Sequence, residues 1–539
     1  MTDLKPAPDN ILVIQLARFG DFLQTTPLLS VLKARHPETR VSVLVDKGRT
    51  ELAEKNPDID EVLSVDLNLL AGIAQSGMAM SDKLKRLQAG VKPLKTEPYG
   101  LVINLNYSRV AALLANLIRA ERYTGPRFGS DRRHLTPSPW AGFILNLMTH
   151  RRLIRFNLVD LLTVYAEASL RPPDGLTYPV SAEDSGLGFE LLGRTDGRAL
   201  IGFQLGSRHA SRQWPVENFA QLGAELIAKK NVSIVLLGTS EEAHFGRLFL
   251  EFLRNILKTR NTGPHHEQRV INLMGRTTIP ALAGVLSHLN LLVTTDTGSM
   301  HLAAAVKTPI LTLFMGPAFC HETGPYGSGH VIAQAMAECG PCQENEAGCE
   351  DAFCRYLITP GLIFSLVDWF LSNQASPLPS RDAFGPDVRL LISSLDDFGT
   401  VYRPLVPWPL TVEDILATAY REAGRAFMRP GYALKEEKIA SEFSVYTDPE
   451  EVELEHVRQS LERIIQLIPS SPFNRPPTGL RELAEETKLK PLIRTVFGTN
   501  LGLDVRFRMA RDMLRVISVN RKAIGRLPSS PAPEGVNWS

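Results

Sequence analysis

Residues 291–327 read LLVTTDTGSMHLAAAVKTPILTLFMGPAFCHETGPYG, and this stretch decides the fold class. Two short apolar runs, Leu291–Thr295 and Pro309–Phe314, flank a predicted helix over Ser299–Val306. Because neither run alternates apolar with polar residues, both are typical of parallel strands that are covered on both faces. The stretch therefore predicts a strand–helix–strand unit of an α/β sheet.

The turn before the predicted helix, Asp296-Thr297-Gly298, is polar. Sheets of this kind bind ligands beyond the carboxyl ends of their strands. Asp296 or Thr297 can cap the helix, and the free N–H groups at its N-terminus favour an anion such as a diphosphate. The same pattern also occurs in α/β units that bind nothing there, so the rest of the chain must decide.

The bulk composition is that of a globular protein of roughly three or four domains. The 539 residues are 44% hydrophobic and 22% charged with a formal net charge of +1, which gives no reason to expect a nucleic-acid partner. No segment reaches the roughly 18 to 20 apolar residues that span a bilayer. The first ten residues, MTDLKPAPDN, lack the apolar core of a signal peptide. We therefore expect a cytoplasmic protein.

The pattern of strand, loop and helix occurs twice. Ile11–Leu16 is a predicted strand, followed by a loop to Asp21, a helix through Leu32 and a second strand. Residues 171–196 have the Pro, Asp, Gly and Ser content of a linker, and the pattern then restarts with the strand Ala199–Leu205. No G-x-G-x-x-G follows the first strand, so a dinucleotide site is not indicated.

The repetition predicts an α/β protein with two Rossmann-like domains that face a cleft, a common place for a ligand. We expect the first domain over residues 1–180 and the second over residues 190–375. Residues 376–539 are predicted to form a mainly helical extension of unknown role, which includes an amphipathic helix over Thr411–Phe427.

Three loops stand out together: ARFGDFLQTTPLL from Ala17, the loop from Ser207 to Pro215, and TDTGSMHLAAA from Thr295. They resemble glycosyltransferase family 9, the ADP-heptose:lipopolysaccharide heptosyltransferases. LVINLNYS from Leu101 and RFNLVDLL from Arg155 are lesser matches, and all five stand in the family's order. The resemblance implies a GT-B fold whose second domain mainly holds the donor. It also implies an inverting heptose transfer from ADP-heptose to the lipopolysaccharide core without a catalytic metal.

Asp21 matches the catalytic Asp of the family. Inverting sugar transfer needs a base for the proton of the acceptor hydroxyl and positive groups for the leaving diphosphate. The alternative is that Asp21 caps the helix that follows it. Arg18 and Arg122 belong to the basic residues of the first half, and they are predicted to bind an anionic acceptor; a solvated surface is the alternative.

The donor is expected on the second half. Arg212 stands where the family often carries a Lys that contacts the donor phosphate, and Asp296 suits sugar hydroxyls because a carboxylate repels phosphate. His301 is either a donor contact or a structural histidine. The predicted donor-binding residues are Ser207, Arg208, Arg212, Asp296, Thr297, Gly298 and His301.

All five cysteines lie between Cys320 and Cys354, and four of them are closely spaced. Cys339, Cys342, Cys349 and Cys354 could close a structural site for zinc or iron. Reduced structural cysteines or a local disulfide are the alternatives. We expect no cofactor for catalysis.

The resemblance therefore predicts a heptosyltransferase-like enzyme with a nucleotide-sugar donor and a lipopolysaccharide-type anionic acceptor. It allows peripheral association with the inner membrane. A glycosyltransferase that modifies a protein or another glycan with a different donor is one alternative, and a catalytically silent GT-B scaffold is another. A GT-B nucleotide-sugar epimerase fits the motifs less well.

Overall fold

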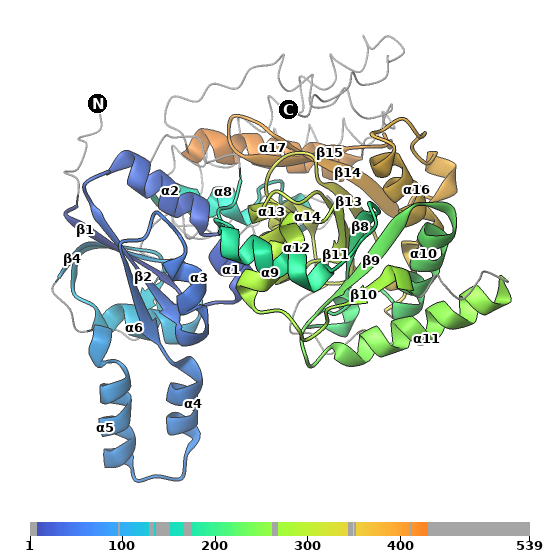
Figure 1. The fold of residues 1–539 in the computed structure, drawn as a ribbon. Coiled ribbons are helices and arrows are strands. Elements are labelled where there is room, and N and C mark those ends of the chain that lie inside the picture. The colour runs from blue at the N-terminus through green and yellow to red at the C-terminus, as the bar shows by residue number, and fades with distance from the viewer. Residues whose placement is uncertain are drawn as a thin grey trace, which may run out of the picture. The chain divides into compact units, whose positions relative to one another are not determined.

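The computed structural model describes residues 8–94, 98–128, 134–135, 151–166, 175–260, 268–342, 349, 352–409 and 411–428. The chain divides into two compact units. Unit 1 is Met1–Ala141 with Phe156–Val406, and unit 2 is Gly142–Arg155 with Pro407–Ser539. Both predicted sheets lie in unit 1 (Figure 1).

The first sheet is parallel, and its described strands have the order β3-β2-β1-β4-β5. The central strand β1 buries the apolar run Ile11–Ile14 completely, as expected for a parallel strand that is covered on both faces. The strands are β1 (Asn10–Gln15), β2 (Arg40–Asp46), β3 (Glu61–Val65), β4 (Tyr99–Asn104) and β5 (Ala120–Thr124), with a separate small pair β6 (Arg127–Phe128) and β7 (His134–Leu135).

Helices follow these strands in sequence, as in a doubly wound fold. Figure 1 shows α4 and α5 as a pair that projects from this sheet. The helices are α1 (Phe19–Leu23), α2 (Thr26–Arg35), α3 (Thr50–Glu54), α4 (Leu67–Gln75), α5 (Met80–Gly90), α6 (Arg109–Leu117) and α8 (Leu158–Thr163), with the 3-10 turns η1 (Lys47–Arg49), η2 (Lys92–Leu94) and η4 (Val164–Ala166).

The second sheet has the described order β10-β9-β8-β11-β12-β13-β14-β15. Its first six strands are parallel, and β14 and β15 join antiparallel at one edge. The strands are β8 (Ala199–Gln204), β9 (Val232–Leu237), β10 (Val270–Asn272), β11 (Leu291–Thr295), β12 (Ile310–Phe314), β13 (Val331–Ala335), β14 (Val388–Leu395) and β15 (Thr400–Pro404). The sheet therefore continues past residue 375, the predicted end of the second domain.

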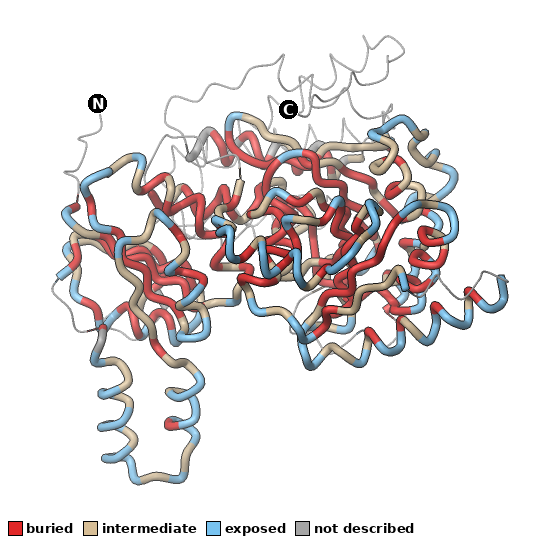
Figure 2. The backbone as a smooth tube through the Cα atoms, in the orientation of Figure 1, coloured by how far each residue is buried: buried red, intermediate tan, exposed pale blue. Residues whose placement is uncertain are grey.

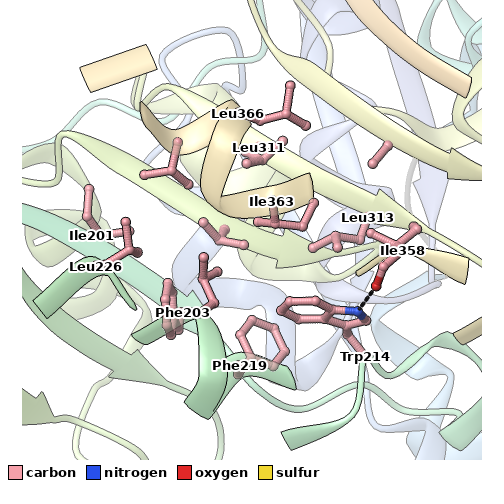
Figure 3. Packing of buried hydrophobic residues seen from close by; sticks show 14 of the residues in the cluster. Ile201, Phe203, Trp214, Phe219, Leu226, Leu311, Leu313, Ile358, Ile363 and Leu366 are labelled. Atoms are coloured by element: carbon pink, nitrogen blue, oxygen red, sulfur yellow. Dashed lines mark hydrogen bonds between the residues drawn. The ribbon is translucent and has the colours of Figure 1, made fainter. Parts of the chain in front are cut away.

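The helices of this half surround the second sheet and bury its apolar strands (Figure 2). Trp214, Phe219 and Phe203 are fully buried in its core, so Trp214 is a packing residue (Figure 3). The helices are α9 (Ala182–Leu192), α10 (Val216–Lys229), α11 (Ala243–Thr259), α12 (Ile279–Ser287), α13 (Gly298–Ala305), α14 (Cys320–Thr323), α15 (Cys354–Leu357) and α16 (Pro360–Leu371), with the 3-10 turns η5 (Ala210–Arg212) and η7 (Arg381–Ala383).

Helix α9 lies inside residues 171–196, where the composition predicted only a linker. That prediction was wrong for this segment. The Ser181 hydroxyl caps the helix by accepting the Asp184 N–H, and the Asp184 carboxylate accepts the Ser181 N–H. Gly188 lets α9 approach α12, because a Cβ on Gly188 would overlap the carbonyl carbon of Gly284. The glycines here serve close helix packing and not chain flexibility.

Unit 2 is described through η3 (Arg151–Leu153) and α17 (Val412–Met428). Arg155 joins them, because its guanidinium contacts the Asp414 carboxylate at 3.2 Å and its carbonyl accepts from Arg421 Nε at 2.8 Å. Helix α17 agrees with the amphipathic helix that the sequence predicts over residues 411–427. The rest of the predicted helical extension, from residue 429, lies outside the described residues.

The predicted α/β class with two Rossmann-like domains is confirmed by the parallel first sheet and the mainly parallel second sheet. The boundaries at residues 180, 190 and 375 remain predictions. Within the described part of the chain, the helices are too short or too polar to cross a membrane.

Candidate active site

Asp21 lies in a short helix and not in the loop that the sequence predicted. The expected helix through Leu32 is divided at Gln24–Thr25 into α1 and α2, and Asp21 is the third residue of α1. Its Oδ2 accepts the backbone N–H of Arg18 at 3.0 Å. Asp21 therefore does cap a helix, but from inside its first turn, and this bond occupies Oδ2.

The surroundings of Asp21 make it a stronger base than an exposed aspartate. Burial raises the pKa of its carboxyl above the ordinary value, and the negative charge of Asp296 acts in the same direction. The hydrogen bond from the Arg18 backbone, the charge of Arg18 and the charge of protonated His301 offset part of that rise in pKa. A raised pKa suits a group that must accept a proton near neutral pH.

A buried network of amides holds the start of the Asp21 segment. The Gln15 side chain accepts from Asn106 Nδ2 at 2.6 Å and from the Ala17 N–H at 3.2 Å, and it donates to Thr25 Oγ1 at 3.1 Å. Asn106 Oδ1 in turn accepts the Leu16 N–H at 2.6 Å. The sequence interpretation did not identify Gln15 or Asn106. A polar Gln in the apolar run ILVIQL was the available signal.

Helices α1 and α13 pack against each other and bring the Asp21 segment to the predicted donor turn. A Cβ on Gly20 would lie 2.7 Å from His301 Cδ2 and 3.3 Å from Gly298 Cα. A Cβ on Gly298 would lie 2.5 Å from Phe19 Cδ1. Side chains at either glycine would therefore force the two helices apart. This contact joins the two halves of unit 1.

His301 is buried at that contact. Its exposed fraction is 5%, and desolvation lowers its pKa to about 4, so the imidazole is neutral at pH 7. The Nδ1 atom is buried and has no hydrogen-bond partner among the described residues. His301 lies close enough to Asp21 for the carboxylate charge to favour its protonated form.

Arg212 and Asp296 form a buried ion pair. Arg212 Nη1 lies 2.9 Å from Asp296 Oδ2, and Thr323 Oγ1 donates to the same oxygen at 3.3 Å. The two charged side chains are 13% and 7% exposed. Because a guanidinium carries five N–H donors in a planar fork, a side chain of this type can bind a carboxylate and an oxyanion together.

Thr297 is the N-cap of α13. Its Oγ1 accepts the Met300 N–H at 3.4 Å, and Thr294 Oγ1 lies 3.2 Å from it. Thr297, and not Asp296, is therefore the cap of α13. The Asp296 carboxylate instead pairs with Arg212. Gly298 is the first residue of α13, where the helix dipole favours an anion.

The other predicted site residues lie in three regions. Ser207 and Arg208 follow β8 in the loop that leads to Arg212; Ser207 is half-buried and Arg208 is exposed. Arg18 precedes α1, close enough to Asp21 for its charge to lower the pKa of that carboxyl. Arg122 is separate from these, half-buried inside the edge strand β5, where it lies opposite Leu101.

Glu242 is a candidate that the sequence interpretation missed. Its Oε2 accepts the Thr239 N–H at 2.9 Å after β9, and a Cβ on Gly206 would overlap its carboxylate. The carboxylate therefore lies over the carboxyl ends of β8 and β9, the edge where such sheets bind ligands. No motif in the sequence marked Glu242.

The four spaced cysteines lie near one another, and all five cysteines of the chain are free thiols. Burial raises the pKa of the Cys342 thiol, and the charges of Cys339, Cys354 and Cys349 raise it further. Within the described residues, no three Cys, His, Asp or Glu side chains are grouped closely enough to hold a metal ion. Metal binding therefore remains a prediction.

Comparisons with known proteins find a similarity to one enzyme family. Residues 88–352 match the model of glycosyltransferase family 9 (heptosyltransferase). Lipopolysaccharide heptosyltransferase 3 of Escherichia coli K12 is 25% identical over 299 residues, which are 55% of this chain and 79% of that protein. Lipopolysaccharide heptosyltransferase 2 of Salmonella typhimurium is 25% identical over 322 residues, which are 58% of this chain and 85% of that protein.

A solved family 9 glycosyltransferase from Veillonella parvula has the same fold. Its TM-score is 0.50 at 22% identity, and the match covers 68% of this chain and 98% of that one. The family match and the curated relatives confirm that this chain resembles glycosyltransferase family 9, the heptosyltransferases.

Proposed function

We propose that the protein is an inverting glycosyltransferase that moves a heptose from ADP-heptose to a hydroxyl of a lipopolysaccharide core. The observation that carries the proposal is the contact of α1 with α13, which brings a carboxylate of raised pKa beside the turn that is predicted to bind the donor. The similarity to lipopolysaccharide heptosyltransferases supports the choice of donor and acceptor.

In the proposed reaction Asp21 takes the proton of the acceptor hydroxyl. The acceptor oxygen attacks the anomeric carbon of the sugar while the bond from that carbon to the diphosphate oxygen breaks, so the configuration inverts. Arg212 and the N-terminus of α13 stabilise the negative charge of the departing diphosphate. His301 is neutral at pH 7, so it adds no positive charge there to that of Arg18 beside Asp21.

Donor recognition follows from the charges of the second half. Arg212 shares its guanidinium between Asp296 and the diphosphate, and Glu242 suits the hydroxyls of a sugar ring because a carboxylate only accepts hydrogen bonds. On the first half, Arg18 is proposed to contact the anionic acceptor. The proposal includes a cytoplasmic location with peripheral association at the inner membrane.

Thermal unfolding with a panel of nucleotide sugars tests the donor. At equal ligand concentration, the nucleotide sugar with the lowest Kd raises Tm most. A ligand present at 100 times its Kd stabilises the native state by about 2.7 kcal/mol. We expect ADP-heptose to give the largest shift and Arg212→Ala to reduce it. A larger shift with another nucleotide sugar would favour the alternative enzyme, and no shift with any of them would favour the silent scaffold.

We also propose that the cysteine cluster holds a structural zinc or iron. The donor set supports this, because four thiols lie within reach of one another's charge and the Ala352 N–H donates to Cys349 Sγ at 3.2 Å. Metal analysis of the purified protein, with Cys342→Ser as the control, tests it. Metal-free protein with every thiol titratable would rule the site out.

A further inference from the structure

The loop that carries Arg212 has local hydrogen bonds, from the Arg212 N–H to the His209 carbonyl at 3.0 Å and from the Gln213 N–H to the Ala210 carbonyl at 3.1 Å. Arg212 ends the 3-10 turn η5, and the side chain of its N-cap residue, His209, makes no capping hydrogen bond. The backbone on both sides of Arg212 also contacts residues around the cysteine cluster. Together with the Arg212–Asp296 ion pair, these contacts place the guanidinium.

The first attachment comes from Arg355. Its Nε donates to the carbonyl oxygen of Gln213, the residue after Arg212, at 2.7 Å. Arg355 follows Cys354 directly, at the start of α15. A hydrogen bond from a charged donor is stronger than one between neutral groups, so this is a firm link between α15 and the loop.

The second attachment is one residue further along. Trp214 Nε1 donates to the carbonyl oxygen of Ile358 at 2.9 Å in the fully buried core (Figure 3). Residues 213 and 214 are thus both bonded to residues 355–358. Any shift of α15 would move the backbone next to Arg212.

The third contact is a close approach of Gly316 to the backbone on the other side of Arg212. The φ of Gly316 is +60°, and a Cβ there would lie 2.6 Å from the carbonyl oxygen of Ser211, so only glycine fits. The Gly316 carbonyl accepts the Cys342 N–H at 3.2 Å, and its backbone also hydrogen-bonds the Cys354 thiol. Gly316 therefore lies between the loop and two of the cysteines.

We propose that Arg355 is a positioning residue that fixes the Arg212 loop for donor binding, with the cysteine cluster acting through the same contacts. The proposal rests on the proposed function for the class of ligand, a nucleoside diphosphate. Arg355 acts through the Gln213 carbonyl and not by touching donor or acceptor. It sets the place of the Arg212 guanidinium, and so it should change the affinity for the diphosphate more than the rate of transfer.

Titration of the full chain with ADP tests the inference. We expect Arg355→Met to raise the Kd for ADP about tenfold, since one charge-assisted bond is lost. Arg355→Lys should recover part of the affinity, because an ammonium can still donate to the Gln213 carbonyl. In the transfer assay Arg355→Met should raise KM for the donor and leave kcat nearly unchanged.

Arg269→Met is the matched control. Arg269 is also half-buried, and its Nη1 donates to the carbonyl oxygen of Ile227 at 3.0 Å in the same half of unit 1. The substitution removes the same kind of bond away from the Arg212 loop. We expect its Kd for ADP to equal that of the wild type.

Amide hydrogen exchange provides a measurement that needs no ligand. Residues 209–216 should exchange faster in Arg355→Met than in Arg269→Met. Equal exchange in the two variants, or unchanged ADP affinity in Arg355→Met, would overturn the inference. If the wild type binds no ADP, the proposed function fails, while the exchange comparison still decides whether Arg355 positions the loop.

Discussion

At the scale of one residue, the Asp21 carboxylate has two properties that suit its proposed role. Its Oδ2 accepts the Arg18 N–H, and its burial raises the pKa of the same group. The hydrogen bond fixes the side chain, while the raised pKa strengthens it as a base. The alternatives of helix cap and base, which were separate in the sequence, are therefore compatible in the structure.

The raised pKa predicts how activity depends on pH. Only ionised Asp21 can take a proton, so kcat/KM should rise with pH through a midpoint above 3.8, the ordinary value for Asp. His301 also titrates on the acid side, with a pKa of about 4, so His301→Gln serves as the control. This variant should keep the acid limb of the profile, the rise of kcat/KM with pH. A profile with no such limb, or one that disappears in His301→Gln, would contradict the assignment.

The same shift in pKa has a consequence for stability. The native state binds a proton on Asp21 more tightly than the unfolded chain does, so the contribution of Asp21 to stability is present at low pH. It is lost as pH rises from 3.8 through the raised pKa. At pH 7 the ionised Asp21 carboxylate therefore lowers the free energy of unfolding. The uncharged amide of Asp21→Asn, which has the same shape, should not lower it.

At the scale of elements, the site depends on the close approach of α1 and α13. Gly20→Ala would place a Cβ 2.7 Å from the buried ring of His301, so the helices must move apart. We expect a loss of about 1–3 kcal/mol in the free energy of unfolding, measured by urea denaturation, together with reduced turnover.

Gly72→Ala is the matched control for that change. Gly72 lies in α4, and a Cβ there would meet nothing within 4 Å. Because Ala is the better helix former, this variant should gain up to about 1 kcal/mol. Equal stabilities for the two variants would show that the α1–α13 contact is not tight.

Strands were more predictable than the site. The run Leu291–Thr295 coincides with β11 because an unbroken apolar run fixes a buried parallel strand. Helix α9 was missed because its Gly, Ser and Asp residues, which pack and cap a helix, have the composition of a linker. The pairing of Arg212 with Asp296 joins residues 84 apart, and no local pattern encodes it.

At the scale of the whole molecule, unit 1 depends on buried bonds between its halves. Asp160 of α8 accepts from Tyr326 Oη at 2.8 Å and from the Thr400 N–H at 3.2 Å. Asn157 donates to Tyr402 Oη at 2.7 Å and to the Gly324 carbonyl at 3.1 Å. These contacts join α8, from the first half of the chain, to the second sheet.

Asp160→Ala tests that connection. It leaves two buried donors without their acceptor, and we expect a cost of about 2–4 kcal/mol in the free energy of unfolding, measured by urea denaturation. Asp382→Ala, at an exposed site, should stay within about 0.5 kcal/mol of the wild type. Similar stabilities for these two variants would mean that the Asp160 bonds do not hold the halves together.

The central claim is that Asp21 is the base of a sugar transfer, and turnover of Asp21→Asn tests it most directly. Asn keeps the shape and can still accept the Arg18 N–H, so the fold and the affinity for ADP-heptose should be retained. We expect transfer to a heptose-deficient lipopolysaccharide core to fall by about 10²–10⁴-fold, the usual contribution of a general base. Wild-type turnover in Asp21→Asn with the donor still bound would contradict this role for Asp21.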